Sequence, residues 1–215
     1  MRGQCLSGSS LKVIAMVTMV IDHTACYFIS DGWEYECMRG IGRIAFPIFA
    51  FLIAEGYRHT RRKWDYGRNL LIFAFISEIP WMLLHTDGSH NVLFTLLAGL
   101  CCIAILDKLE NHKILPLLVV LVIALATSVL NTDYGIQGVA LVLMFYLFKD
   151  KPLLQLLFAL PLFYDFHPLG ILASFGLISL YNGERGFIKE AYSKFLFYAF
   201  YPCHLIVIWA LLLVV

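Results

Sequence analysis

Three ionisable side chains lie within the first long apolar stretch of this sequence. The stretch LKVIAMVTMVIDHTACY begins next to Lys12 and carries Asp22 and His23 beyond its middle. Ionisable groups inside a membrane-spanning helix usually serve function, because a charge in lipid is costly. Histidine is the usual general base near neutral pH. Lys12 precedes His23 by eleven residues, so a helix places both on nearly one face, about 16 Å apart. The alternative for His23 is a structural hydrogen bond to a backbone carbonyl.

The second apolar stretch, GRIAFPIFAFLIAEGYRHTRRK, carries a further charge at its outer end. Arg43 is close in depth to Asp22 and His23, and we expect it to pair with Asp22. Pro47 removes a backbone hydrogen bond and is expected to kink this helix towards the bundle interior.

A group of charges marks the inner end of the same stretch. Glu55 is within reach of Lys12 or Arg58, and a simple interfacial ion pair is the alternative to a binding role. A basic cluster follows, made of Arg58, His59, Arg61, Arg62 and Lys63. Such clusters commonly set topology or contact anionic lipid. Because guanidinium groups bind phosphate well, Arg58, Arg61 and Arg62 are also candidates for binding a polyphosphate.

Further polar residues are predicted at or just inside the outer face. Glu78 lies two-thirds of the way along the third stretch, and Asn91 begins the fourth. Asp133 and Tyr134 follow in the segment NTDYGIQG. Together with Asp22, His23 and Arg43 they suggest a polar cavity that opens outwards, although a loop Asp is by itself more typical of a turn. Tyr201 and His204, near the middle of the last stretch, are additional candidates for substrate binding.

The composition requires a membrane to accommodate these stretches. Of the 215 residues 60% are hydrophobic and 14% are charged, about half of the roughly 25% charge of soluble domains. A span needs about 20 apolar residues. We therefore predict an all-α, polytopic transmembrane helical bundle with about nine spans. The expected spans are 11–30, 41–57, 69–84, 91–106, 114–130, 136–148, 153–164, 169–181 and 195–215.

The distribution of basic residues predicts a cytoplasmic N-terminus. With that orientation, all 16 Lys and Arg residues except Arg39 and Arg43 fall on the cytoplasmic side, as the positive-inside rule requires. We expect residues 1–215 to form a single domain. A net charge of +1 without a long basic run argues against a nucleic-acid partner. The spacing of the six cysteines predicts neither a disulfide nor a metal site.

Several motifs, in order along the chain, together resemble the TraX family of bacterial membrane proteins. They are LKVIAMVTMVIDH, GRIAFPIFAFLIAEGYRHTR, ISEIP, NVLFTLL, DYGIQGV and FYPCHL. The resemblance implies N-acetylation of a pilin-like protein at its amino-terminus. TraX proteins in turn look distantly similar to acyltransferase family 3, which has a basic residue, ten intervening residues and a His in its first helix. Lys12 and His23 match that spacing, with Lys in place of the usual Arg.

The resemblance and the residues fit one reaction without a permanently bound cofactor. Acetyl-CoA, the expected co-substrate, would bind through Lys12 and the basic cluster. His23 would act as general base or carry the acetyl group. Arg43 or Asn91 would stabilise the oxyanion, and Asp22 and Glu78 would orient the acceptor or set protonation.

Two other functions fit an apolar chain with buried charges. A proton-coupled transporter also places carboxylates and His inside the bilayer, and a non-catalytic partner of an export system is the third possibility. The acceptor could be a peptide, protein, lipid or glycan. The expected location is the bacterial cytoplasmic (inner) membrane.

Overall fold

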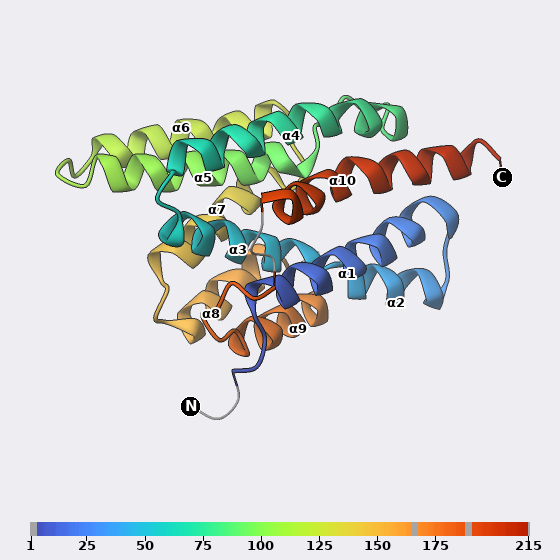
Figure 1. Cartoon of the computed structure of the whole chain (residues 1–215), viewed down its shortest axis with the longest axis horizontal. Coiled ribbons are helices and arrows are strands. Elements are labelled where there is room, and N and C mark those ends of the chain that lie inside the picture. Colours follow the sequence, from blue (N-terminus) through green and yellow to red (C-terminus); the bar gives the residue numbers. More distant parts are fainter. Residues whose placement is uncertain (1–3, 165–166, 188–190, 215) are drawn as a thin grey trace. The chain divides into compact units, whose positions relative to one another are not determined.

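A computed structural model describes residues 4–164, 167–187 and 191–214, with the backbone alone for residues 191–194. Within these residues the regular secondary structure consists of ten α-helices and two isolated β-bridges, so the predicted all-α class is confirmed. The helices, labelled in Figure 1, are α1 (Gly8–Phe28), α2 (Trp33–Gly42), α3 (Ala45–His59), α4 (Lys63–Leu84), α5 (Val92–Lys108), α6 (Leu115–Val129), α7 (Gly135–Leu147), α8 (Pro152–Leu162), α9 (Pro168–Ser179) and α10 (Ala191–Leu212).

Most predicted spans agree with these helices to within three residues at each end. Helices α4 and α10 begin six and four residues earlier than predicted, and the second span differs more. The segment before Ile41, expected to be a loop, contains most of α2. Its first turn carries Glu34 and Glu36 and its last turn Arg39, which suits the helix dipole. Pro47 has no N–H to donate to the carbonyl of Arg43, four residues earlier. The helix accordingly breaks at residues 43–44, between α2 and α3. The interruption expected from Pro47 is therefore a break one turn before it, with Pro47 itself in the first turn of α3.

The lengths and surfaces of the helices are those of a membrane protein. Among the described residues, four segments are long and apolar enough to cross a bilayer: Gly8–Phe28, Trp33–His59, Lys63–Leu84 and Phe195–Leu212. Shorter apolar helices are α6, α7, α8 and α9. Large apolar side chains are exposed along α4 and α6, including Ile72, Phe75, Ile79, Leu121 and Val122. Lipid accommodates such surfaces, and the chain is a helical membrane protein.

The chain forms two compact units. The first unit comprises Met1–Leu52 and Phe148–Phe197, apart from the residues that are not described, and the second comprises Ile53–Leu147 and Tyr198–Val214. The single domain expected for residues 1–215 stays a prediction, as does the cytoplasmic N-terminus.

In the first unit, α1 packs against α2, α2 against α9 and α8 against α9. Its core contains Leu11 and Ala15 of α1 and Ile48 of α3. The segment before α1 is held by backbone hydrogen bonds: Leu6 donates to Leu180 at 2.9 Å and accepts from Asn182 at 2.9 Å. The start of α1 is thereby fixed to the segment after α9.

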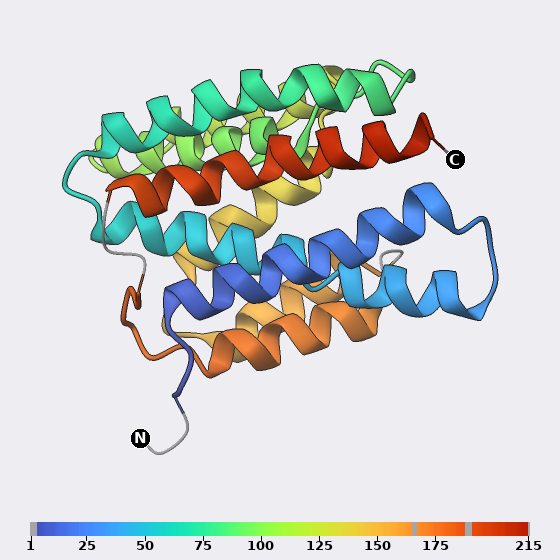
Figure 2. The same ribbon diagram turned by 45° about the vertical axis from the view of Figure 1, so that its right-hand side comes forward.

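In the second unit, α5 contacts α4, α6 and α7. Gly99 of α5 allows close packing, because a Cβ at this position would lie 2.8 Å from Cβ of Val142 in α7. The Tyr198 ring of α10 stacks on the Phe73 ring of α4 with 5.1 Å between centroids. Both views show these two helices side by side (Figures 1 and 2). The second unit thus contains α4, α5, α6 and α7, the end of α3 and most of α10.

Candidate functional site

Asp22 lies on a buried face of α1 and forms an ion pair with α2. Arg39 Nη1 donates a hydrogen bond to Asp22 Oδ2 at 2.8 Å. The expected partner was Arg43. Arg39 lies in the last turn of α2 and Arg43 is its C-cap four residues later, so helical spacing alone cannot distinguish them. Arg43 also attracts the Asp22 carboxylate electrostatically. The structure gives the hydrogen-bonded pair to Arg39.

Two glycines allow the helices around this pair to approach closely. A Cβ on Gly42 would overlap the side chain of Asp22. A Cβ on Gly170 of α9 would lie 2.8 Å from Cβ of Arg43 and would overlap the carbonyl of Gly40. The C-terminal end of α2 is thus packed tightly against α1 and α9, and Arg43 is held within this packing.

Lys12 and His23 belong to one unbroken helix. Because α1 runs from Gly8 to Phe28, the eleven-residue separation places the two side chains near one face, about 16 Å apart along the axis. Both residues are half-buried. The His23 ring meets the Tyr27 ring edge-on with 6.1 Å between centroids. Lys12 Nζ lies 5.9 Å from the centre of the Phe197 ring.

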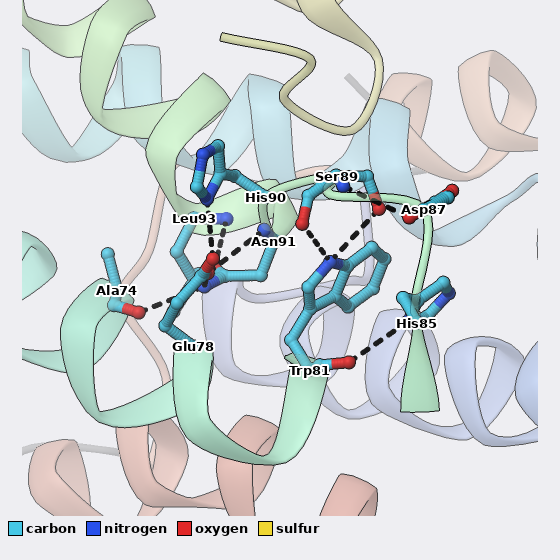
Figure 3. A network of polar contacts seen from close by, with 9 residues as sticks. All are labelled: Ala74, Glu78, Trp81, His85, Asp87, Ser89, His90, Asn91 and Leu93. Carbon is cyan, nitrogen blue, oxygen red and sulfur yellow. Dashed lines mark hydrogen bonds and ion pairs between the residues drawn. The ribbon is translucent and has the colours of Figure 1, made fainter. Parts of the chain in front are cut away.

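The second unit contains a carboxylate, an imidazole and an amide in direct contact (Figure 3). Glu78 Oε1 lies 2.5 Å from His90 Nδ1. Its other oxygen, Oε2, accepts a hydrogen bond from Asn91 Nδ2 at 2.6 Å and one from the Asn91 backbone N–H at 3.3 Å. The Glu78 side chain is 14% exposed and that of His90 42%. A largely buried carboxylate therefore holds a half-exposed imidazole.

Asn91 is fully buried, and both its amide nitrogen and its amide oxygen are hydrogen-bonded. Nδ2 donates to Glu78 and also to the Ala74 carbonyl at 2.9 Å. Oδ1 accepts from the Leu93 N–H at 3.0 Å and caps α5. With both amide hydrogens donated, Asn91 positions Glu78. Its expected role in stabilising an oxyanion stays a prediction.

A second loop fixes the backbone of His90. The His90 N–H donates to the Asn131 carbonyl at 3.0 Å, and the His90 carbonyl accepts from the Asp133 N–H at 2.8 Å. Thr95 of α5 reinforces this pairing through hydrogen bonds to Thr132 and Asp133. The predicted residues Glu78, Asn91, Asp133 and Tyr134 thus belong to connected elements.

Tyr134 has an unusual backbone conformation in this second loop. Its φ is 62°, which is rare for a bulky residue. Strained residues of this kind persist where the surroundings determine them, and they are common at functional sites. Tyr134 is half-buried.

The segment between α4 and α5 is held by Trp81. Its Nε1 donates to the Ser89 carbonyl at 2.9 Å, and its ring stacks on His85 with 3.7 Å between centroids. Burial lowers the pKa of His85 from its ordinary value. Hydrogen bonds from the Ser89 hydroxyl and amide lower the pKa of Asp87. Figure 3 shows this group beside the Glu78 contacts.

At the other end of the second unit, Arg58 is occupied by contacts within the protein. Its Nη1 donates to Glu55 Oε2 at 3.1 Å, and Nη2 donates to the carbonyls of Phe145 at 2.9 Å and Tyr146 at 2.5 Å. His59 Nε2 lies 2.7 Å from Glu55 Oε1. Glu55 and Arg58 therefore form the interfacial ion pair considered above, and Arg58 also caps the end of α7.

The other basic residues of the cluster differ in their exposure and in whether they form an ion pair. Asp107 Oδ2 accepts from Lys63 Nζ at 2.7 Å and from the Tyr57 hydroxyl at 2.8 Å. The Arg62 side chain is 87% exposed and lies 3.8 Å from an Asp65 oxygen, while Arg61 is exposed. Arg61 and Arg62 are thus the cluster members most accessible to an anion.

Tyr201 and His204 are both buried in α10. Their ring centroids are 5.4 Å apart. His204 Nδ1 lies 3.1 Å from the Phe200 carbonyl one turn earlier, as in the structural alternative for a membrane histidine. A substrate-binding role for either residue stays a prediction.

The predicted site residues fall into both units. Lys12, Asp22, His23 and Arg43 lie in the first, and the others lie in the second. The single outward-facing cavity stays a prediction. Among the described residues, no three His, Cys, Asp or Glu side chains are grouped so as to hold a metal ion.

Three residues in these contacts were not predicted as site residues: Arg39, His90 and Asp107. Arg39 and His90 lie in segments that look like outer loops, and Asp107 lies at a helix end. Polar residues are common in loops and at helix ends, so nothing in the sequence marks these three as site residues. Their partners are 17, 12 and 44 residues away in the chain, and only the packing of the helices brings them into contact.

The fold and these contacts define a polytopic helical membrane protein with charged residues buried within its helices. The chain matches the TraX protein family over residues 7–212 and belongs to that family. The resemblance inferred from the motifs is therefore confirmed.

Two similar proteins span different parts of the chain. "Probable fimbrial assembly protein FimC, serogroup H1" of Dichelobacter nodosus is 32% identical, covering 93% of each chain. "Uncharacterized protein RP591" of Rickettsia prowazekii (strain Madrid E) is 30% identical over 94 residues, which are 43% of this chain and 35% of the relative. No solved structure matches this chain.

Proposed function

We propose that this protein is a membrane acetyltransferase that moves an acetyl group from cytoplasmic acetyl-CoA to an amine of a peptide or protein at the outer face. Membership of the TraX family supports a role in pilin modification. The name of the Dichelobacter relative, a probable fimbrial assembly protein, supports the same class of acceptor. A donor made in the cytoplasm and an exported acceptor meet at the cytoplasmic (inner) membrane of a bacterium.

One observation carries the proposal: α1 is a single helix with Lys12 near its start and His23 on nearly the same face. The separation of about 16 Å suits an extended pantetheine arm between a bound phosphate and a thioester. Lys12 supplies a positive charge for the phosphate. His23 acts as general base towards the acceptor amine or carries the acetyl group transiently.

The contacts of the basic cluster narrow the choice of phosphate-binding residues. Arg58 donates to Glu55 and to two backbone carbonyls, so its guanidinium has a structural role. Arg61 and Arg62 are exposed and have the forked donors that suit phosphate oxygens. We assign Arg61 and Arg62 to the binding of CoA phosphates.

The other predicted residues serve the acceptor side of the reaction. Arg43 stabilises the negative charge that develops on the acetyl oxygen. Asp22, which is paired with Arg39, orients the acceptor or sets the protonation near His23. Tyr134, Tyr201 and His204 contribute to acceptor binding.

The first experiment is calorimetric titration of acetyl-CoA into the purified protein in detergent, followed by mass spectrometry of a short peptide with a free α-amino group. We expect Lys12→Ala to weaken acetyl-CoA binding about tenfold, as loss of one charge-assisted phosphate contact would. His23→Ala should keep binding and reduce acetyl transfer by about 10²- to 10⁴-fold. Lys113→Ala and His112→Ala, both exposed between α5 and α6, are the matched controls.

Absence of acetyl-CoA binding to the folded wild-type protein would overturn the proposal. Proton-coupled flux in liposomes would then support a transporter. Full export function with His23→Ala would support a non-catalytic membrane partner.

A further inference from the structure

We propose that His90 is a catalytic residue that accepts the proton of the acceptor amine, with Glu78 and Asn91 as its positioning residues. This inference rests on the proposed function and assigns a role to a histidine that the sequence motifs leave out. The contacts from which it is argued all lie in the second unit.

The first argument is the orientation of the imidazole. The carboxylate of Glu78 lies 2.5 Å from Nδ1 of His90. A neutral imidazole that donates its Nδ1–H to a carboxylate keeps Nε2 as its acceptor. The side chain is 42% exposed, so the ring combines an anchored nitrogen with access from outside. A base held by a carboxylate in this way is the arrangement of many general-base catalysts.

The second argument is how firmly the carboxylate is held. Both Glu78 oxygens have partners, because Asn91 donates to Oε2 through Nδ2 and through its backbone N–H. Asn91 is itself fixed by the Ala74 carbonyl and by its cap on α5. The Ala74 carbonyl and the cap on α5 thus hold Asn91, Asn91 holds Glu78, and Glu78 positions the His90 ring (Figure 3).

The third argument is that hydrogen bonds also hold the backbone of His90 in place. Its N–H and carbonyl bond to Asn131 and Asp133. Its ring meets Phe94 of α5 edge-on with 5.9 Å between centroids. Groups that act on a reacting atom must be held within a fraction of an ångström, so this double fixation suits a catalytic base.

The proton transfer is balanced as follows. An acceptor ammonium gives one proton to His90 Nε2, which yields a neutral amine and an imidazolium next to the Glu78 carboxylate. The amine nitrogen then forms a bond to the acetyl carbon while the carbon–sulfur bond to CoA breaks. The second proton of the amine passes to His23, the general base of the proposed function, and from there to the CoA thiolate. The exposed imidazolium returns its proton to water.

The test compares wild type, His90→Gln and Glu78→Gln by the pH profile of kcat/KM for acetyl transfer to the same α-amino peptide. A model α-amino group has a pKa of about 8, so alkaline solution itself removes the proton that His90 takes. We expect His90→Gln to lose about 10²-fold near pH 7, the lower range for general-base catalysis, and to recover most of this loss near pH 9. Glu78→Gln should show a smaller loss with the same recovery.

His85→Gln is the matched control, because His85 lies in the same segment and stacks on Trp81. We expect its ratio to wild type to be the same at every pH. Calorimetry with acetyl-CoA shows whether each variant is folded. Free imidazole added to His90→Gly tests the same chemistry without relying on the Gln variant.

Two results would overturn the assignment of His90 while leaving the acetyltransferase proposal intact. One is an unchanged kcat/KM in His90→Gln. The other is a loss that is equal at every pH and insensitive to imidazole, which would indicate a structural role. A wild type that neither binds acetyl-CoA nor acetylates the peptide would instead refute the proposed function, and the role of His90 with it.

Discussion

Each of three buried carboxylates in this membrane protein has a nearby partner. Asp22 accepts from Arg39, Glu55 from Arg58, and Glu78 from Asn91. An unpaired charge away from water is costly, and removing one member of a buried pair leaves the other uncompensated. Single substitutions at these positions therefore test both stability and function.

Asn91 offers a direct test at the scale of one residue. Asn91→Ala removes the cap of α5 and the hydrogen bonds to Glu78 and Ala74. We expect a loss of about 1–3 kcal/mol in the free energy of unfolding. Denaturant unfolding in detergent measures it, with Asn69→Ala on the exposed side of α4 as the control. Equal stability of the two variants would contradict the role given to Asn91.

His85 gives the segment between α4 and α5 a pH-dependent stability. Burial lowers its pKa below the ordinary 6.5, so the unfolded chain takes up a proton at a higher pH than the folded protein does. This contribution to stability is complete above about pH 6.5 and is lost as the pH falls below it. His85→Phe retains a ring to stack on Trp81 and should flatten the change in melting temperature between pH 8 and pH 5. An unchanged slope would refute this.

At the scale of helices, the close packing of α1, α2 and α9 depends on glycine residues at the contacts. A Cβ on Gly42 would overlap Asp22, whereas a Cβ on Gly40 meets nothing within 4 Å. We expect Gly42→Ala to destabilise the protein by about 1–3 kcal/mol through overpacking. Gly40→Ala on the same helix should be neutral or slightly stabilising. Thermal unfolding of the two variants compares them, and a reversed order would argue against this packing.

Arg58 connects the end of α3 to the end of α7. It donates to the carbonyls of Phe145 and Tyr146, and its guanidinium lies 5.1 Å from the Tyr146 ring centre. Arg58→Lys keeps the charge and loses the forked donors, so we expect stability to fall by about 1–3 kcal/mol. Arg61→Ala should leave stability unchanged and weaken acetyl-CoA binding. The opposite pattern in unfolding and calorimetry would reverse the two roles.

For the whole molecule, the positive-inside rule predicts a cytoplasmic N-terminus. Asp31 lies between α1 and α2, and Glu110 lies between α5 and α6; both are exposed. In a cysteine-free background we expect a membrane-impermeant maleimide to label Asp31→Cys in intact cells. Glu110→Cys should be labelled only after the cells are opened. The reverse result would invert the predicted orientation.

Hydrophobic periodicity and length determined the helices because a bilayer sets the size of each span. The predicted range 114–130 differs from helix α6 (Leu115–Val129) by one residue at each end, and α4 ends at Leu84 as predicted. The difference around α2 arose because its charged residues look like a loop, although their order suits the helix dipole. The family was also readable from the ordered motifs.

The sequence by itself determined which polar residues lie inside the helices, since any charge within an apolar stretch stands out. It also determined the relation of Lys12 to His23, because both belong to one helix with a fixed rise per residue. Only the tertiary structure decided which partners these charges have. Arg39 donates the hydrogen bond to Asp22, with Arg43 close enough to attract the same carboxylate, and His90 and Asn91 meet at Glu78. Such pairs join different elements. The packing of helices and loops that brings them together cannot be read from the spacing of residues along the chain.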